Sequence, residues 1–196
     1  MLGRVFLFSF DKSLEKKIIK QIVKPTLEAL KQKKHPYKGF LYVGLMIKNK
    51  EPFLIEYNVR MGDPECQVII PRLQTDLVQL LSASVDDKLN KIKIKWSKDK
   101  CMTTVLCSRG YPNKYLNNKK INLEHVNLIK KSFIFHAGTK MIDGLLFSNG
   151  GRVLNIVVLG NSYLKIRNQI SKIIKTINWK YGFFRKDIGW RIIKKK

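Results

Sequence analysis

The segment from Ile55 to Glu65, IEYNVRMGDPE, holds the residue types whose spacing could best support chemistry. Alternate side chains of a strand share a face, so Glu56, Asn58 and Arg60 would lie on one side at intervals of about 7 Å. The opposite side would carry three apolar residues that can pack on a core: Ile55, Tyr57 and Val59. The pattern predicts a strand with one packed face and one chemically active face.

The polar face suits a cation and a phosphate. Oxygen atoms of Glu56 and Asn58 are ligands that Mg²⁺ accepts, and Mg²⁺ usually takes few protein ligands together with substrate phosphates. The planar guanidinium of Arg60 can bind phosphate or acyl-phosphate oxygens. Gly62 permits close approach of the backbone. Two further carboxylates could hold an amine or a ribose hydroxyl: Asp63 and Glu65.

A simpler interpretation also fits the E-x-N-x-R pattern taken alone. An amphipathic edge strand could carry the same residues with its polar side merely solvated. The G-D-P-E sequence that follows at 62–65 favours the functional interpretation.

The twenty residues from Leu54 to Leu73, LIEYNVRMGDPECQVIIPRL, resemble the metal-binding signature of the phosphoribosylamine–glycine ligase family of ATP-grasp enzymes, E-[FY]-N-x-R-x-G-D-P-E-x-Q. Five further blocks are similar to segments of the same family and follow in the same order: 37–46, 108–112, 135–140, 149–154 and 185–189. Together the similarity extends over residues 18–192.

The resemblance implies an ATP-dependent carboxylate–amine ligase of purine synthesis. Such an enzyme phosphorylates the glycine carboxylate with ATP, and 5-phosphoribosylamine then displaces the phosphate to give glycinamide ribonucleotide. Glu56 and Asn58 match the family's Mg²⁺ or Mn²⁺ ligands, and Arg60 would act catalytically by stabilising charge on the transferring phosphoryl group. Asp63 and Glu65 are expected to contact substrate.

The carboxy-terminal blocks have two interpretations. Their glycines can simply be hairpin turns. The family's C-terminal domain also helps to enclose the active site, so three basic residues could meet a phosphate: Lys140, Arg152 and Lys186. The sequence leaves both interpretations open.

The resemblance also defines what we expect to be missing. The family's amino-terminal domain, and the first part of the ATP-grasp fold with its lid, have no counterpart here, and residues 1–12 match nothing in relatives. We therefore expect a fragment, or one half of a split enzyme whose other half is encoded separately, that carries the metal-binding part of the site and does not bind ATP tightly alone. A shifted reading frame or a misplaced start codon would look the same.

Several elements must position this segment. Apolar periodicity predicts a helix over residues 13–31, interrupted at Pro25. The run 40–47 and the segment 53–58 predict the two arms of a hairpin. A helix over residues 76–84, capped by Thr75, would follow.

Beyond a Lys-rich stretch at 88–100 we expect a second domain. Turn residues separate four predicted strands, at 102–107, 132–136, 145–147 and 152–159. A helix over 162–177 would turn five apolar residues inward: Leu164, Ile170, Ile173, Ile174 and Ile177. The class is α+β, with the carboxy-terminal part of an ATP-grasp domain at 13–90 and a small mixed α/β C-terminal domain at 91–196.

Charge is a weaker guide to function. The chain holds 39 Lys and Arg against 14 Asp and Glu, a net charge of +25. Nucleic-acid or membrane-surface binding is one explanation. Another explanation is an AT-rich genome, which makes Lys, Asn and Ile abundant together. The scattered positions of the basic residues favour this second explanation. We expect no nucleic-acid partner, although an inactive remnant or a basic polyanion- or RNA-binding module is the alternative function.

The remaining composition points to a reducing cytoplasm. The three cysteines, Cys66, Cys101 and Cys107, include no CxxC pair and argue against a disulfide framework or a Cys-type zinc site. No apolar run reaches the length of about 18 residues that a membrane span needs.

Overall fold

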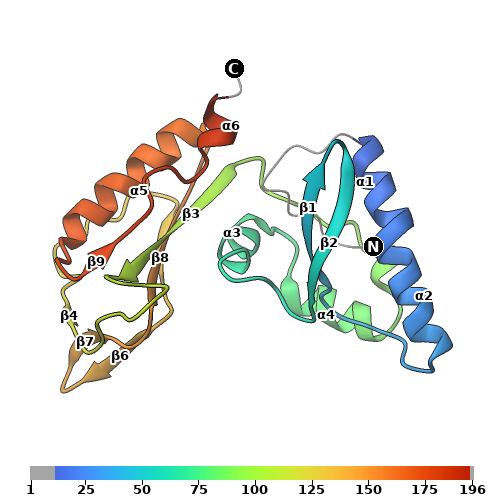
Figure 1. The fold of residues 1–196 in the computed structure, drawn as a ribbon, viewed down its shortest axis with the longest axis horizontal. Helices are drawn as coiled ribbons and strands as arrows, with labels where there is room; N and C mark the ends of the chain where they lie inside the picture. The colour runs from blue at the N-terminus through green and yellow to red at the C-terminus, as the bar shows by residue number, and fades with distance from the viewer. Residues whose placement is uncertain (1–11, 195–196) are drawn as a thin grey trace. The chain divides into compact units, whose positions relative to one another are not determined.

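The computed structural model describes residues 12–194, and its contacts divide these into two compact units. The first unit contains residues up to Glu65 together with Leu73–Trp96, and the second contains Cys66–Arg72 together with the chain from Ser97 onward. Figure 1 shows the elements of both. The last crossing between the units lies inside the Lys-rich stretch, whereas the division of the sequence into domains at 13–90 and 91–196 stays a prediction.

The first unit is a long helix beside a two-stranded antiparallel sheet, with shorter helices at its end. Its elements are α1 (Lys12–Ile18), a π-helical turn (Ile19–Val23), α2 (Lys24–Gln32), β1 (Tyr42–Lys48), β2 (Glu51–Asn58), α4 (Leu77–Val85) and a 3₁₀ turn (Leu89–Lys91).

The π-helical turn accommodates the predicted interruption at Pro25. A proline has no N–H for the carbonyl four residues earlier, which disturbs the hydrogen-bond ladder of the preceding turn. That turn is widened here, and the N–H of Lys24 bonds to the carbonyl of Ile19, five residues back. The helix passes through the proline instead of ending there.

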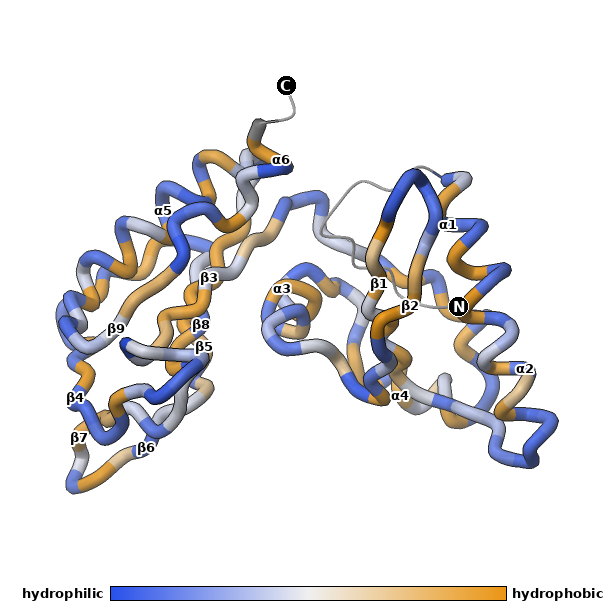
Figure 2. Tube along the Cα trace, viewed as in Figure 1, coloured by the Kyte–Doolittle hydropathy of each residue, from blue (hydrophilic) through white to orange (hydrophobic). Residues whose placement is uncertain are grey.

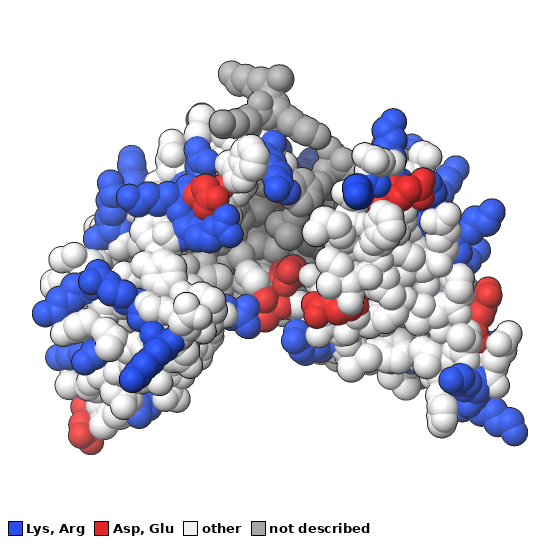
Figure 3. Space-filling view, viewed as in Figure 1, with Lys and Arg blue, Asp and Glu red and all other residues white. Residues whose placement is uncertain are grey.

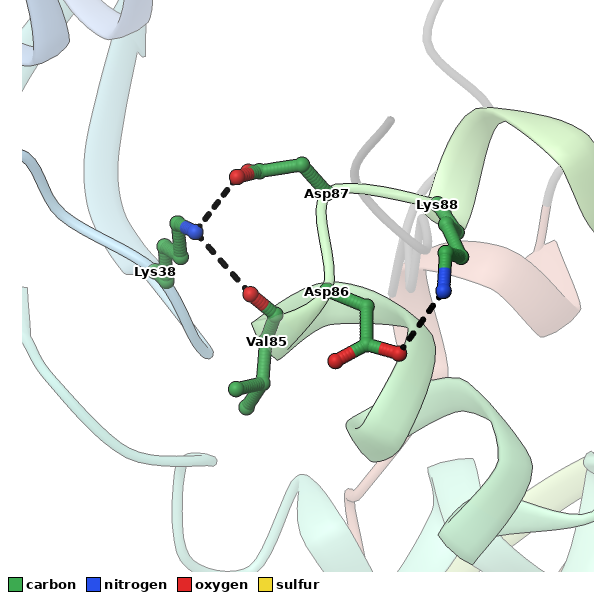
Figure 4. A network of polar contacts seen from close by, with 5 residues as sticks. All are labelled: Lys38, Val85, Asp86, Asp87 and Lys88. Carbon is green, nitrogen blue, oxygen red and sulfur yellow. Dashed lines mark hydrogen bonds and ion pairs between the residues drawn. The ribbon is translucent and has the colours of Figure 1, made fainter.

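Three polar contacts close the carboxyl end of α4 (Figure 4). The ammonium of Lys38 donates to the Val85 carbonyl at 2.9 Å and to Asp87 Oδ2 at 2.6 Å, while Lys88 pairs with Asp86 at 3.2 Å. A cation at a helix carboxyl end satisfies carbonyls that lack partners within the helix. Lys38 thereby connects the chain that leads into β1 with the end of α4.

The amino end of α4 corrects one prediction. Asp76, not Thr75, caps the helix, because Asp76 Oδ1 accepts the Gln79 N–H at 2.8 Å. Thr75 Oγ1 instead accepts the N–H of Lys95 at 2.7 Å. Both residues are good caps in sequence terms, and the pairing with residue 95 could not be read from local sequence.

The second unit is an antiparallel sheet covered by a helix. Strands β5 (Ser132–His136), β8 (Arg152–Gly160), β3 (Lys100–Ser108) and β9 (Gly182–Phe183) form a four-stranded sheet in that order. A smaller sheet contains β4 (Lys120–Ile121), β7 (Leu145–Ser148) and β6 (Thr139–Ile142). The remaining elements are α3 (Cys66–Ile69), a 3₁₀ turn (Ile70–Arg72), α5 (Tyr163–Ile177) and α6 (Trp190–Lys194).

The main core lies between α5 and strands β3 and β8. Every residue of β8 from Val153 to Leu159 is buried, and Leu154, Ile156 and Val158 join a cluster with the inner side of α5. In Figure 2 α5 alternates between hydrophobic and hydrophilic residues while β8 is largely hydrophobic. This is the pattern of a helix packed by one face on a central strand.

The inner face of α5 agrees with the sequence except at its first turn. Ile170, Ile173, Ile174 and Ile177 are buried as predicted, but Leu164 is 48% exposed. The buried residue near the amino end is Ile166, which is spaced four residues from Ile170. The prediction for Leu164 was wrong because six residues separate it from Ile170, far from a whole number of helical turns.

We predict that Ile170→Ala lowers the free energy of unfolding of the full chain by about 2–5 kcal/mol, since it removes a side chain that is 1% exposed. Leu164→Ala on the same helix is the matched control and should change it by less than about 1 kcal/mol. Urea unfolding followed by circular dichroism measures both. Equal losses for the two variants would contradict this account of the α5 core.

Candidate functional site

The β1–β2 hairpin carries the candidate site, and one extra residue in β2 determines what each face presents. Gly44 pairs with Glu56, but the next residue of β1, Leu45, pairs with Leu54. Ile55 is therefore a β-bulge without a partner in the ladder. On one face the hairpin presents Tyr42, Gly44 and Met46 from β1, and Asn58, Glu56 and Phe53 from β2.

The long helix lies on the other face. Tyr57 faces away from Glu56 and Asn58, and its hydroxyl is 2.5 Å from the hydroxyl of Thr26 in α2. At the tip of the hairpin Lys17 of α1 also pairs with Glu51. Tyr57 therefore packs as predicted, but Ile55 and Val59 do not, since they are 64% and 72% exposed. The reason is local: Ile55 occupies the bulge, and Val59 lies beyond the end of β2.

Glu56 and Asn58 meet on the open face. Asn58 Nδ2 donates to Glu56 Oε1 at 3.1 Å. Gly44 makes room for this pair, because a Cβ there would stand 2.9 Å from Glu56 Cγ. A half-turn of the amide would present Asn58 Oδ1 in place of its nitrogen, since the two ends of an amide have nearly the same shape.

These residues fit a hard divalent cation. One carboxylate and one amide oxygen, side by side on an exposed strand face, are the small protein contribution that Mg²⁺ takes when phosphates supply further oxygens. Among residues 12–194 there is no group of three or more His, Cys, Asp or Glu side chains that could hold a metal without such help.

A second carboxylate reaches the same face from the turn after β2. The Tyr42 hydroxyl donates to Glu65 Oε1 at 3.4 Å. Burial raises the pKa of Tyr42, and the charge and hydrogen bond of Glu65, then the charge of Glu56, raise it further. Gly62 adjoins both groups, because a Cβ on it would stand 3.0 Å from the Tyr42 ring and would collide with the Glu65 carboxylate.

Arg60 and Asp63 both lie beyond the end of β2. Strand β2 ends at Asn58, so the predicted alignment of Arg60 with Glu56 and Asn58 was wrong. The Arg60 guanidinium donates to the neighbouring Met61 carbonyl at 2.8 Å. Asp63 is exposed in the turn. The catalytic role of Arg60 and the substrate role of Asp63 stay predictions.

Tyr42 is the residue that the sequence alone did not single out. It lies directly opposite Asn58 in the hairpin register and touches the second carboxylate. A pairing of the two predicted strands around the turn at 48–52 would have placed it on the same face as the candidate ligands.

The three basic residues of the C-terminal blocks lie in the second unit. Lys140 is on β6, Arg152 is on β8, and Lys186 is exposed beside the ion pair of Arg185 and Asp187. Their possible contact with a phosphate stays a prediction.

Close packing explains why glycine occupies two positions in those blocks. A Cβ on Gly138 would stand 2.9 Å from the Gly150 Cα, and one on Gly151 would collide with the Tyr111 ring. These close backbone approaches support the structural interpretation of these glycines.

Two of the cysteine thiols, those of Cys101 and Cys107, do not suit nucleophilic chemistry. Burial is the main cause that raises the pKa of Cys101 to about 12, and burial also raises the pKa of Cys107. A thiol is a nucleophile as its thiolate, which is scarce near neutral pH at such pKa values.

Basic side chains are spread over the visible surface of both units and do not gather into one patch (Figure 3). Among the described residues no helix is long and apolar enough to cross a membrane.

Two sequence profiles match this chain. The profile of the phosphoribosylglycinamide synthetase ATP-grasp (A) domain matches residues 5–66, and that of the phosphoribosylglycinamide synthetase C domain matches residues 101–191. The first match includes the five predicted site residues of the segment 56–65. It begins within the segment 1–12, most of which lies outside the described residues.

Two curated relatives and one solved structure are named as phosphoribosylamine–glycine ligases. The phosphoribosylamine–glycine ligase of Agrobacterium fabrum is 38% identical over 92% of this chain, and the chloroplastic one of Arabidopsis thaliana is 39% identical over 94%. The crystal structure of the Thermotoga maritima phosphoribosylamine–glycine ligase matches 92% of the chain with a TM-score of 0.75 and 29% identity. This chain spans 43%, 36% and 44% of those three proteins.

We predict that Gly44→Ala weakens Mn²⁺ binding about 10-fold, because the new methyl group displaces the Glu56 side chain. Gly160→Ala is the matched control, since its Cβ would meet Ile166 at an ordinary 3.4 Å. Electron paramagnetic resonance of free Mn²⁺ measures the affinity of the full chain. Unchanged binding in Gly44→Ala would show that Gly44 does not shape the site.

Proposed function

We propose that this chain, which belongs to the phosphoribosylglycinamide synthetase family, supplies the metal-binding part of a ligase that joins glycine to 5-phosphoribosylamine. ATP would be cleaved to ADP and phosphate, and glycinamide ribonucleotide would form. The chain covers less than half of its relatives, so it would act as a fragment or as one half of a split enzyme.

The pair formed by Glu56 and Asn58 carries the proposal. It lies within the E-x-N-x-R-x-G-D-P-E segment, on the hairpin face that the long helix leaves open. Bound Mg²⁺ or Mn²⁺ would neutralise charge on the phosphates of ATP. Glu56 and Asn58 would hold that ion. Arg60, two residues after Asn58, would contact the transferring phosphoryl group.

The remaining residues would serve the other substrates. Glu65, and Asp63 two residues before it, offer carboxylates that can accept hydrogen bonds from an amine or a hydroxyl. Reactions of this kind depend mainly on positioning and on preorganised charge, which a strand-borne pair can provide. A cytoplasmic location would suit such an enzyme.

The first unit has features of an incomplete domain. Its buried apolar residues among those described are Ile18, Val23 and Ala83 alone, whereas most buried apolar residues belong to the second unit. Its sheet has two strands, so each strand has an outer edge that no described strand pairs. Unpaired edges and uncovered apolar surface are typical of a surface that another polypeptide completes.

We propose that this polypeptide carries the amino-terminal part of the same ligase. The uncovered surface includes Met46 and Phe53, which face each other on the side of Glu56 and are 58% and 54% exposed. Helix α4 adds a stripe at helical spacing: Val78, Leu81 and Val85, which are 69%, 41% and 69% exposed.

We predict that the chain alone self-associates through this surface in sedimentation velocity. Replacing Met46 and Phe53 with serine should reduce the association, because it removes apolar area from the open face. Leu128→Ser, at a residue of the second unit that is 49% exposed, is the control and should have no effect. A monodisperse monomer of the unaltered chain at high concentration would contradict the prediction.

The enzymatic proposal is tested by ADP release. Glycine, 5-phosphoribosylamine, ATP and Mg²⁺ are mixed with this chain, with and without the protein encoded immediately upstream. We expect activity only when both are present. Glu56→Ala should reduce the rate to about one hundredth or less, since loss of even an outer-shell partner costs 10–100-fold. Glu28→Ala, at an exposed residue of α2, should leave the rate unchanged.

Absence of activity in both mixtures would reduce the ligase assignment to ancestry. The alternative, a basic polyanion- or RNA-binding module, would then predict RNA affinity that falls steeply with salt and does not respond to Glu56→Ala.

A further inference from the structure

The open face of the hairpin carries Glu56, and Tyr42 on the same face contacts a second carboxylate, that of Glu65. A Cβ on Gly44 would be 3.6 Å from Tyr42 Cε1, and a Cβ on Gly62 would be 3.0 Å from Cε2 on the opposite edge of the ring. Gly44 adjoins the side chain of Glu56, and Gly62 adjoins that of Glu65. One edge of the Tyr42 ring therefore lies toward Gly44 and the Glu56 side chain, and the other lies toward Gly62 and the Glu65 carboxylate.

Tyr42 also forms a hydrogen bond to one of the two carboxylates. Its hydroxyl donates to Glu65 Oε1 at 3.4 Å, whereas Glu56 takes its hydrogen bond from Asn58 at 3.1 Å. A phenolic O–H is a hydrogen-bond donor, and Glu65 is the acceptor here. Each carboxylate is thus tied to a different partner.

We propose that Tyr42 is a positioning residue that holds Glu65 away from Glu56, so that a divalent cation meets Glu56 and Asn58 but not Glu65. The inference rests on the proposed function, because it assumes the cation site. It assigns the two carboxylates different tasks: Glu56 binds the cation, and Glu65 stays available to an N–H or hydroxyl group of a substrate.

Keeping Glu65 away from the cation would have a chemical benefit. A second carboxylate on the cation would add negative charge to a site that must also accept nucleotide phosphates, and like charges repel. It would also raise the affinity for the free cation, because affinity grows with the charge of the ligands. A carboxylate engaged by the cation would be a poorer hydrogen-bond acceptor for an amine.

The contact between Tyr42 and Glu65 can be tested without a metal. The full chain has seven tyrosines, and labelling their Cζ with ¹³C gives one resonance for each. The resonance absent from Tyr42→Phe identifies Tyr42. We expect Glu65→Gln to move that resonance and to leave those of tyrosines far from residue 65 in place. An unmoved Tyr42 resonance would overturn the inference.

The effect on the cation is tested with Mn²⁺ and paramagnetic resonance. Glu65→Gln should change the Mn²⁺ dissociation constant less than about twofold, because Glu65 does not bind the cation. Tyr42→Phe keeps the ring but frees Glu65, and should tighten Mn²⁺ binding about threefold or more. The double variant should return to within about twofold of the wild-type value.

The outcomes separate this inference from the proposed function. Unchanged or weaker binding in Tyr42→Phe, or a gain that persists in the double variant, would overturn the separating role of Tyr42. Wild-type binding of Mn²⁺ that Glu56→Ala leaves intact would overturn the proposed cation site and the cation part of this inference. The tyrosine resonance would still decide whether Tyr42 holds Glu65.

Discussion

The extra residue in β2 is the constraint on which the candidate site depends. A strand changes face with every residue, so a bulge at Ile55 reverses which residues of Glu51–Leu54 share a side with Glu56. With it, Phe53 and Met46 continue the face that bears Glu56 and Asn58. The same face therefore joins a polar end suited to a cation and an apolar end suited to a polypeptide.

The sequence was informative where a pattern is local and repeated. A continuous apolar run predicted the first arm of the hairpin, and alternation along the second arm placed Glu56 and Asn58 on one face, as the structure does. Alternation could not show the bulge at Ile55 or the end of β2 at Asn58, because both depend on the pairing with β1. The bulge accounts for the error at Ile55, and the end of β2 accounts for the errors at Val59 and Arg60.

Longer elements were predicted better than short ones for the same reason. Helix α5 and strands β3 and β8 have enough residues for a period to emerge, whereas β4 and β9 have two residues each and were missed. Leu164 shows the limit within a long helix, since the stripe of buried residues starts only at Ile166. The role of Tyr42 required knowledge of a cross-strand partner and of a turn twenty residues later.

The small apolar core of the first unit has a consequence for the lifetime of the chain in a cell. Quality-control proteases degrade proteins in proportion to the time they spend unfolded. The described residues of this unit include three buried apolar ones, so burial contributes little to keeping it folded. A second polypeptide that covered the hairpin and α4 would lengthen the lifetime of this chain by mass action. Its abundance would then follow the abundance of that polypeptide, which would keep the two halves of a divided enzyme in balance without shared control of their genes.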